Sequence, residues 1–148
     1  MPNSSASPGS FFPNLPGQWS IERTVSTGDA FSGIARFLIL GPNRLLLKEN
    51  GSMSLTNGTR VEAENSWVWE WVSETRINVL FHREPEELYH ALDFISSKDG
   101  YNASASHRCG PDIYRGIYNI GRDAITVHQS VKGPRKSYRL KSLYRRRD

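Results

Sequence analysis

The chain has 148 residues, among them 19 Lys and Arg, 15 Asp and Glu, and a single cysteine. This length is typical of one domain. The single cysteine excludes a disulfide within the chain and fits a reducing compartment, so we expect a cytoplasmic protein. No apolar run is long enough to span a bilayer as a helix, and we therefore expect no membrane partner.

Positive charge is concentrated at the C-terminal end of the chain. Residues 132–148 carry eight Lys or Arg and one Asp, a balance of +7, whereas the rest carries eleven Lys or Arg against fourteen Asp or Glu, a balance of −3. A nucleic-acid function would rest on this segment alone. It lacks an RNA- or DNA-binding signature, and its charges alternate as on a solvated strand face. The sequence therefore argues against a nucleic-acid partner.

The first elements in chain order are a polar leader and a strand. Residues 1–10 are rich in Ser and Pro, lack the features of a secretion signal, and are predicted to be disordered. We expect one folded domain over residues 11–148. Pro13 and Pro16 argue against a helix in residues 11–16, and the alternation of Trp19, Ile21 and Arg23 predicts the first strand.

The next segments predict hairpins. Residues 32–41 read as a strand that ends at a Gly-Pro-Asn turn, and residues 44–51 and 52–58 end at Asn50-Gly51 and Asn57-Gly58. Asn-Gly between alternating segments is a strong hairpin signal. Two such signals close together predict an up-and-down meander.

Strand patterns continue to the end of the chain, in residues 59–73, 76–82, 87–96, 101–109, 114–120, 124–133 and 137–146. Trp67, Trp69 and Trp71 share one face of the first of these segments, where they could line a cavity or, more simply, pack in the core. Only residues 83–92 could form a helical turn, and Pro85 argues against it. Short strands with turns every 8–12 residues predict an all-β barrel or sandwich, and we favour a small antiparallel up-and-down barrel of about 8–10 strands.

Both ends of the folded part resemble a known family. Gly17-Gln18-Trp19, at the start of the first strand, is similar to the Gly-x-Trp signature of the lipocalin-like (calycin) barrels. In those proteins an arginine near the end of the last strand packs over the tryptophan. Arg145, Arg146 and Arg147 are the candidates here, with Arg145 the first choice by position. Gly17, Trp19 and Arg145 are thus the structural residues that the resemblance implies.

The match extends through almost the whole chain. The span from Leu15 to Arg146 resembles a family of small lipocalin-like proteins of unknown function, in the segments PGQW, GIARF, YHALDF, HRCGPDIYRGIY, VKGPRKSY and YRRR. The resemblance implies a barrel that binds a small molecule, and it brings no established reaction. Gln129 departs from the aromatic residue that the family favours there.

One cluster of residue types could carry chemistry. His107 and Cys109 share a strand face and His90 lies on another candidate strand, so the three could form a zinc set. Cys109 could also act as a nucleophile with His107 as its base. No metal-ligand spacing or oxyanion hole accompanies them, and we therefore predict no metal and no cofactor.

A second group could line a pocket. Tyr114 and Tyr118 share a face on either side of Gly116, which could leave room for a ligand or mark a bend. Asp112 follows Gly110-Pro111 and is best explained as a turn cap. Lys136 shares a face with Tyr138 and could sit at a barrel mouth or extend into solvent.

Two functions follow from these residues. The first is binding of a small, largely apolar molecule in the barrel, by a monomer or homodimer, with a lining of His90, His107, Tyr114, Tyr118, Gln129, Lys136 and Tyr138. The alternative is a cofactor-free isomerase, lyase or cyclase of a secondary metabolite that uses the same cavity. Its candidate catalytic residues are His107, Cys109 and Tyr114.

Overall fold

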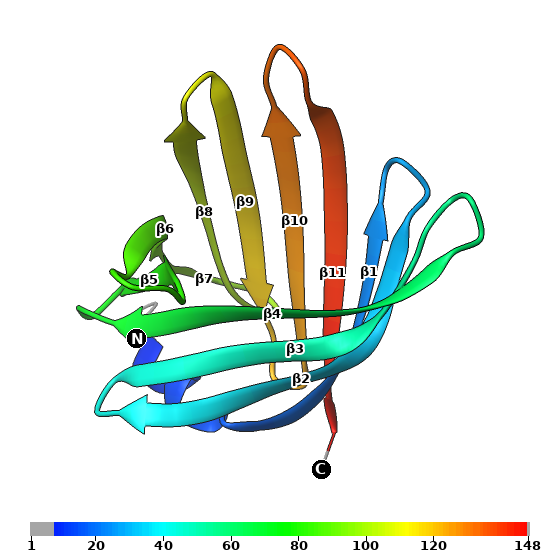
Figure 1. Cartoon of the computed structure of the whole chain (residues 1–148). Helices are drawn as coiled ribbons and strands as arrows, with labels where there is room; N and C mark the ends of the chain where they lie inside the picture. The colour runs from blue at the N-terminus through cyan, green and yellow to red at the C-terminus, as the bar shows by residue number, and fades with distance from the viewer. Residues whose placement is uncertain (1–7, 148) are drawn as a thin grey trace.

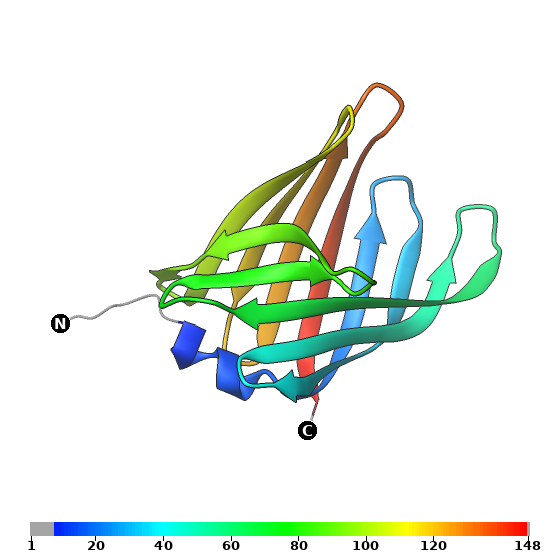
Figure 2. The same cartoon turned by 60° about the vertical axis from the view of Figure 1, so that its left-hand side comes forward.

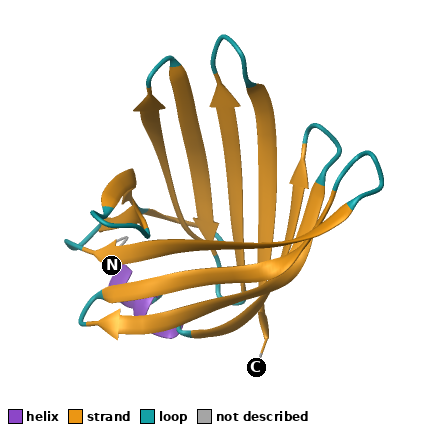
Figure 3. Cartoon of the chain, viewed as in Figure 1, coloured by secondary structure: helices purple, strands orange, loops and turns teal. Residues whose placement is uncertain are grey.

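The computed structural model describes residues 8–147, which form one antiparallel sheet of eleven strands with two short 3₁₀ turns ahead of it (Figures 1 and 3). The turns are η1 (Pro8–Ser10) and η2 (Phe12–Asn14), and the strands are β1 (Gly17–Val25), β2 (Ala30–Gly41), β3 (Arg44–Ser54), β4 (Arg60–Trp71), β5 (Arg76–Phe81), β6 (Glu87–Asp93), β7 (Ile95–Ser97), β8 (Gly100–Cys109), β9 (Asp112–Ile120), β10 (Ala124–Lys132) and β11 (Ser137–Arg147). The all-β, up-and-down prediction is confirmed. Within residues 8–147, no helix has the length and apolarity needed to cross a membrane.

The sheet curls into a nearly closed barrel. Its strand order is β6-β5-β4-β3-β2-β1-β11-β10-β9-β8-β7. Consecutive strands therefore pair with each other except for β6 and β7, which are the two ends of the sheet, and β11 lies beside β1. The two ends of the sheet meet where β6 contacts β8. Figure 2 shows β4, β5 and β6 crossing in front of β9 to β11, with an interior between the two layers. Strand β7 has three residues and arises because the predicted strand 87–96 breaks at the buried Phe94.

The two Asn-Gly signals have different outcomes. Asn57-Gly58 lies in the turn from β3 to β4, where Gly58 has a φ of 91°. The hairpin predicted at Asn50-Gly51 is wrong, because β3 runs straight through it. Gly51 pairs with Gly33 of β2, and a Cβ on Gly33 would lie 2.1 Å from the Asn50 carbonyl oxygen. These glycines let two long strands approach closely.

The segment before β1 closes one end of the barrel. Phe11, Phe12 and Leu15 are buried there, and the Phe11 ring lies 5.2 Å from the ring of Phe94. Part of the predicted disordered leader, residues 1–7, lies outside the described residues, and the remaining three form η1. The expectation of no helix here needs a correction, because η2 is a single 3₁₀ turn with Pro13 in its first positions. Proline fits there, since its missing N–H would have no partner in the first turn.

The arginine over Trp19 is Arg146, and the assignment to Arg145 is wrong. The Arg146 guanidinium carbon lies 4.2 Å from the Trp19 ring centroid, and Arg146 Nη2 donates to the Asn14 carbonyl oxygen at 2.7 Å. The register explains the difference, because Arg146 pairs directly with Trp19 and Arg145 pairs with Ser20. Residues that pair across strands share a sheet face, so Arg145 points outward.

Candidate functional site

An interior cavity of about 220 Å³ lies above the packed end of the barrel. Its walls come from β1, β3 to β6 and β9 to β11. Aromatic side chains supply much of the lining, namely those of Trp67, Trp69, Tyr89, Tyr114, Tyr118, Tyr138 and Tyr144. The turns at 26–29, 55–59, 110–111 and 133–136 surround the end of the barrel opposite the segment 8–16 (Figure 1).

The tryptophan stripe of β4 packs in the core and also forms one wall of the cavity. Trp69 is buried, and Trp67 is half-buried with its ring stacked on Tyr89 at a centroid distance of 5.0 Å. Trp71 lies farther along, against Phe12 at 5.8 Å, and does not line the cavity. The interpretation of this stripe as core packing therefore fits all three, and two of them also face the empty space.

A buried charged network faces the cavity from β1, β3 and β11. Arg23 Nη2 donates to both carboxylate oxygens of Glu49 at 3.1 Å, and its Nε donates to Ser142 Oγ at 2.7 Å. The Tyr144 hydroxyl also donates to Glu49, and Asn65 Nδ2 donates to it at 3.3 Å. The side chains of Arg23 and Glu49 are 11% and 0% exposed. A charged pair this deep is uncommon unless hydrogen bonds satisfy it.

The electrostatics keep Arg23 charged and Tyr144 protonated. Burial lowers the pKa of Arg23, but Tyr144 and Glu49 outweigh that effect, so the pKa lies above its usual value and Arg23 stays charged. Burial raises the pKa of Tyr144 well above its usual range, and the negative charge of Glu49 adds to the rise. None of the hydrogen bonds among the described residues uses Arg23 Nη1. Because Arg23 also lines the cavity, Nη1 is the Arg23 donor that a bound molecule could use.

His90 and Tyr118 form a second buried pair. His90 Nδ1 lies 2.8 Å from the Tyr118 hydroxyl, and Nε2 lies 3.4 Å from the Tyr114 carbonyl oxygen. Because a carbonyl can only accept, Nε2 carries the proton and Nδ1 accepts from Tyr118. Burial lowers the pKa of His90 to about 4, so the ring is neutral at neutral pH. Burial also raises the pKa of Tyr118 well above its usual value.

Gly116 makes room for this pair. A Cβ at Gly116 would lie 2.8 Å from His90 Cε1 and 2.8 Å from a ring carbon of Tyr118. From the sequence, Gly116 was expected either to leave room for a ligand or to mark a bend. The structure shows a third role, because the space above Gly116 is taken by His90 and Tyr118. The His90 imidazole can reach the inner face of β9 because residue 116 has no side chain.

Polar contacts continue toward the open end. Gln129 Nε2 donates to the Tyr89 hydroxyl at 3.1 Å, and burial raises the pKa of Tyr89. Lys136 Nζ donates to the Tyr114 hydroxyl at 3.2 Å, and this hydrogen bond raises the pKa of Lys136. Lys136 Nζ also lies 3.6 Å from Asp112 Oδ2. The lysine therefore spans the rim with its charge partly balanced.

Four of the seven predicted ligand-binding residues line the cavity, namely Tyr114, Tyr118, Gln129 and Tyr138. His90 lies behind the wall that Tyr118 forms. His107 pairs directly with Tyr114, so the two faces on either side of the Gly110-Pro111 turn look into the same interior. His107 lies beside Tyr89 at a ring distance of 5.7 Å. Their role in binding stays a prediction.

Cys109 shares a strand face with His107 but is more exposed. It is exposed at the end of β8 and pairs with Asp112. In the described part of the chain, no group of three or more His, Cys, Asp and Glu side chains is placed to hold a metal ion. The structure thus brings His107 and Tyr114 together, but it does not assemble His90, His107 and Cys109 into a metal site.

The sequence reasoning missed the charged network. Arg23 stands at an inward position of the alternation that begins with Trp19, and Glu49 follows Leu45 and Leu47 at the same spacing. Charged residues at two inward positions were the available signal. Their pairing could not be read from the sequence, because it depends on how β1 and β3 curve toward each other inside the barrel.

Comparisons with known proteins bear on the fold and the family. The chain resembles the solved structure of EF1p2_mFAP2b bound to DFHBI, with 11% identity, a TM-score of 0.53 and coverage of 98% of this chain and 100% of the other. It also resembles mFAP1, a redesigned β barrel bound to DFHBI, with 13% identity, a TM-score of 0.50 and coverage of 97% and 100%. At such identity the likeness shows the fold alone. No curated protein matches the sequence. The model of the family of unknown function DUF6314 matches residues 15–146, and the chain therefore belongs to that family.

Proposed function

We propose that this protein binds a small, neutral, largely apolar molecule in the interior cavity. The observation that carries the proposal is the cavity itself, where aromatic walls surround a buried arginine with a free donor nitrogen. Barrels with a similar fold have been solved with DFHBI bound. That likeness supports the use of such a barrel for a ligand only by analogy of fold.

The cavity limits the size and shape of the ligand. Its volume of about 220 Å³ is below the range of roughly 300–1,000 Å³ that is common for drug-sized ligands. The Trp67 ring and the Tyr118 ring belong to opposite walls. A flat, ring-containing compound would contact both walls and bury most of its apolar surface.

The charge of the network limits the polarity of the ligand. Arg23 and Glu49 balance each other, so a charged ligand beside them would be buried without compensation, at a high cost in free energy. A neutral compound with a carbonyl or similar acceptor would instead accept a hydrogen bond from Arg23 Nη1. The Tyr118 hydroxyl donates its hydrogen bond to His90, and its oxygen could accept one from a donor on the ligand.

The alternative of a cofactor-free isomerase, lyase or cyclase has less support. An acid or base must have a free position at the reacting atom. Here His90 Nδ1 accepts a hydrogen bond from Tyr118, and the Tyr144 hydroxyl donates one to Glu49. Cys109 is exposed at a strand end. The titratable groups of the cavity are thus mostly engaged with one another.

Native mass spectrometry of protein purified from its own host tests the proposal. We expect a retained small molecule that is absent from the variant Leu47→Trp, because Leu47 lines the cavity and the indole would fill it. Leu46→Trp is the matched control, since Leu46 pairs with Val68 on the outer face of the same strand. Circular dichroism confirms that both variants fold.

The possible results distinguish a binding protein, an enzyme, and a barrel that holds no ligand. Equal retention by both variants, or no retained molecule and no saturable binding of small aromatic carbonyl compounds, would contradict interior binding. Incubation of the retained compound with fresh protein distinguishes the two functions. An unchanged mass supports a binding protein, and a product of different structure supports the enzyme.

A further inference from the structure

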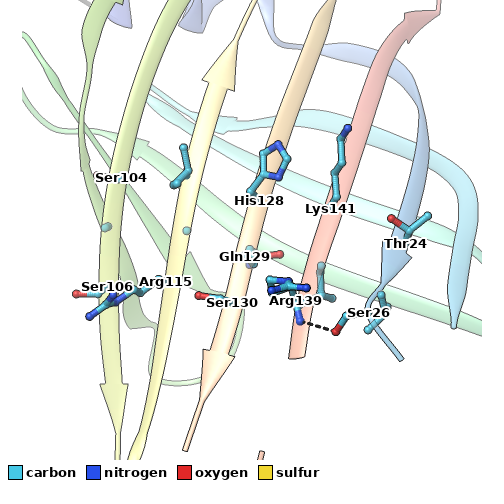
Figure 4. A pocket seen from close by; sticks show the side chains of 15 residues that line it. Thr24, Ser26, Ser104, Ser106, Arg115, His128, Gln129, Ser130, Arg139 and Lys141 are labelled. Atoms are coloured by element: carbon cyan, nitrogen blue, oxygen red, sulfur yellow. Dashed lines mark hydrogen bonds between the residues drawn. The ribbon is translucent and has the colours of Figure 1, made fainter. Parts of the chain in front are cut away.

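A second concavity lies on the outside of the barrel and is separate from the cavity described above. This groove of about 860 Å³ crosses the outer face of β8 to β11 and the end of β1. Figure 4 shows Arg115, His128, Arg139 and Lys141 on neighbouring strands, with Ser106 and Ser130 between and beside them. These basic side chains and hydroxyls supply most of its polar lining.

The sheet register sets the cations in a regular pattern. Arg115, Ser130 and Arg139 are direct partners across β9, β10 and β11, so they form one row with the serine in the middle. Neighbouring strands lie about 4.8 Å apart, which puts the two arginine backbones roughly 10 Å apart. Lys141 stands two residues beyond Arg139 on the same face, about 7 Å away. In Figure 4 the Arg115 guanidinium lies beside Ser106 of β8, so this long side chain would have to turn toward β10 to meet a group bound at Ser130 and Arg139.

The positive charge in the groove has no internal partner. Among the described residues, Arg115, Arg139 and Lys141 form no ion pair, and no Asp or Glu lines the groove. Five of the other arginines have carboxylate partners, namely Arg23, Arg44, Arg76, Arg83 and Arg146, and the groove differs from the remaining unpaired arginines in bringing several basic side chains onto one face. Arg115, Arg139 and Lys141 are exposed and share one sheet face. A group of basic side chains without carboxylate partners attracts anions.

We infer that this groove binds a soluble molecule that carries a phosphoryl group. A phosphate offers several acceptor oxygens to the guanidinium forks of Arg115 and Arg139, and the Ser130 hydroxyl between them adds a further donor. The groove volume lies within the range of small-molecule sites. The lining contains no Phe, Tyr or Trp, so it lacks the stacking surface that single-stranded nucleic acids use. This inference does not depend on the proposed function of the interior cavity.

Titration of the full chain with inorganic pyrophosphate, followed by amide NMR shifts, tests the site. We expect saturable shifts centred on Arg115, Ser130 and Arg139 that persist at physiological salt. Arg139→Gln should weaken binding roughly tenfold or more, as expected for a lost charge-assisted hydrogen bond. Arg122→Gln is the matched control, because Arg122 is exposed in the turn between β9 and β10 and lies outside the groove.

Three results would overturn the inference. The first is the absence of saturable shifts. The second is an equal loss in Arg139→Gln and Arg122→Gln, which would show attraction by net charge alone. The third is a clear preference for anionic vesicles, an acidic peptide or single-stranded RNA over pyrophosphate at equal charge concentration. A selective loss in Arg139→Gln with unchanged thermal stability supports the site.

Discussion

Replacement of Glu49 by leucine tests whether the buried network has the energetics that its geometry implies. Removal of one partner of a buried ion pair costs about 3–5 kcal/mol, because the other charge stays buried without compensation. Arg23 is 11% exposed and borders the cavity, so it can recover some solvation. We therefore expect Glu49→Leu to lower the free energy of unfolding by about 3 kcal/mol, near the lower end of this range.

The change should be large in a melting experiment. At about 2.1 cal/mol/K per residue, unfolding of a chain of this length has an entropy near 0.3 kcal/mol/K, so a loss of about 3 kcal/mol lowers Tm by about 10 °C. The double variant Arg23→Met with Glu49→Leu removes both charges and should recover most of that loss. Urea unfolding followed by circular dichroism gives the free energies.

The control for this prediction is Glu64→Leu, on the outer face of β4. Glu64 is exposed, and a substitution there should change stability by less than about 0.5 kcal/mol. If Glu49→Leu is no more destabilising than Glu64→Leu, or if the double variant is as unstable as the single one, the buried pair is not coupled as described.

Three further predictions concern other parts of the barrel. The pKa of His90, about 4 in the folded state, lies below the unfolded value of about 6.5. The contribution of the neutral His90 ring to the free energy of unfolding is therefore complete above pH 6.5 and is lost as the pH falls toward 4. Between pH 7 and 4.5, the free energy of unfolding of the wild type should therefore fall by about 2–3 kcal/mol more than that of His90→Leu. Urea unfolding measures this difference, and His128→Leu should behave as the wild type. Arg146→Ala should cost about 1–2 kcal/mol by loss of the cation–π contact and a hydrogen bond, and an equal cost in Arg145→Ala would contradict the assignment. Gly116→Ala should cost about 1–3 kcal/mol through overpacking, and unchanged thermal unfolding would show that His90 has room to move.

The strand pattern made the fold predictable from the sequence. Period-2 alternation and turn residues located the strands from residue 59 onward to within a few residues, and the Gly17-Gln18-Trp19 signature indicated the barrel. The failure at Asn50-Gly51 has a physical cause. An Asn-Gly pair predicts a turn from local conformational freedom, but Gly51 is instead needed for a close approach to Gly33.

The candidate site was predictable only in part, because it depends on register. His107 and Tyr114 were both predicted to line the cavity, and their direct pairing puts them on the same sheet face. Arg145 was one position away from the arginine over Trp19, since a shift of one residue reverses the sheet face. The contact between Arg23 and Glu49 joins strands that are not neighbours in the sheet, so no local pattern could reveal it.

A crystal structure of the protein with its retained compound is the most direct test of interior binding. Our account predicts density between the Trp67 and Tyr118 walls, with an acceptor atom of the compound within hydrogen-bond distance of Arg23 Nη1. A compound located outside the barrel, or one inside it that carries a charge and avoids Arg23, would contradict the account.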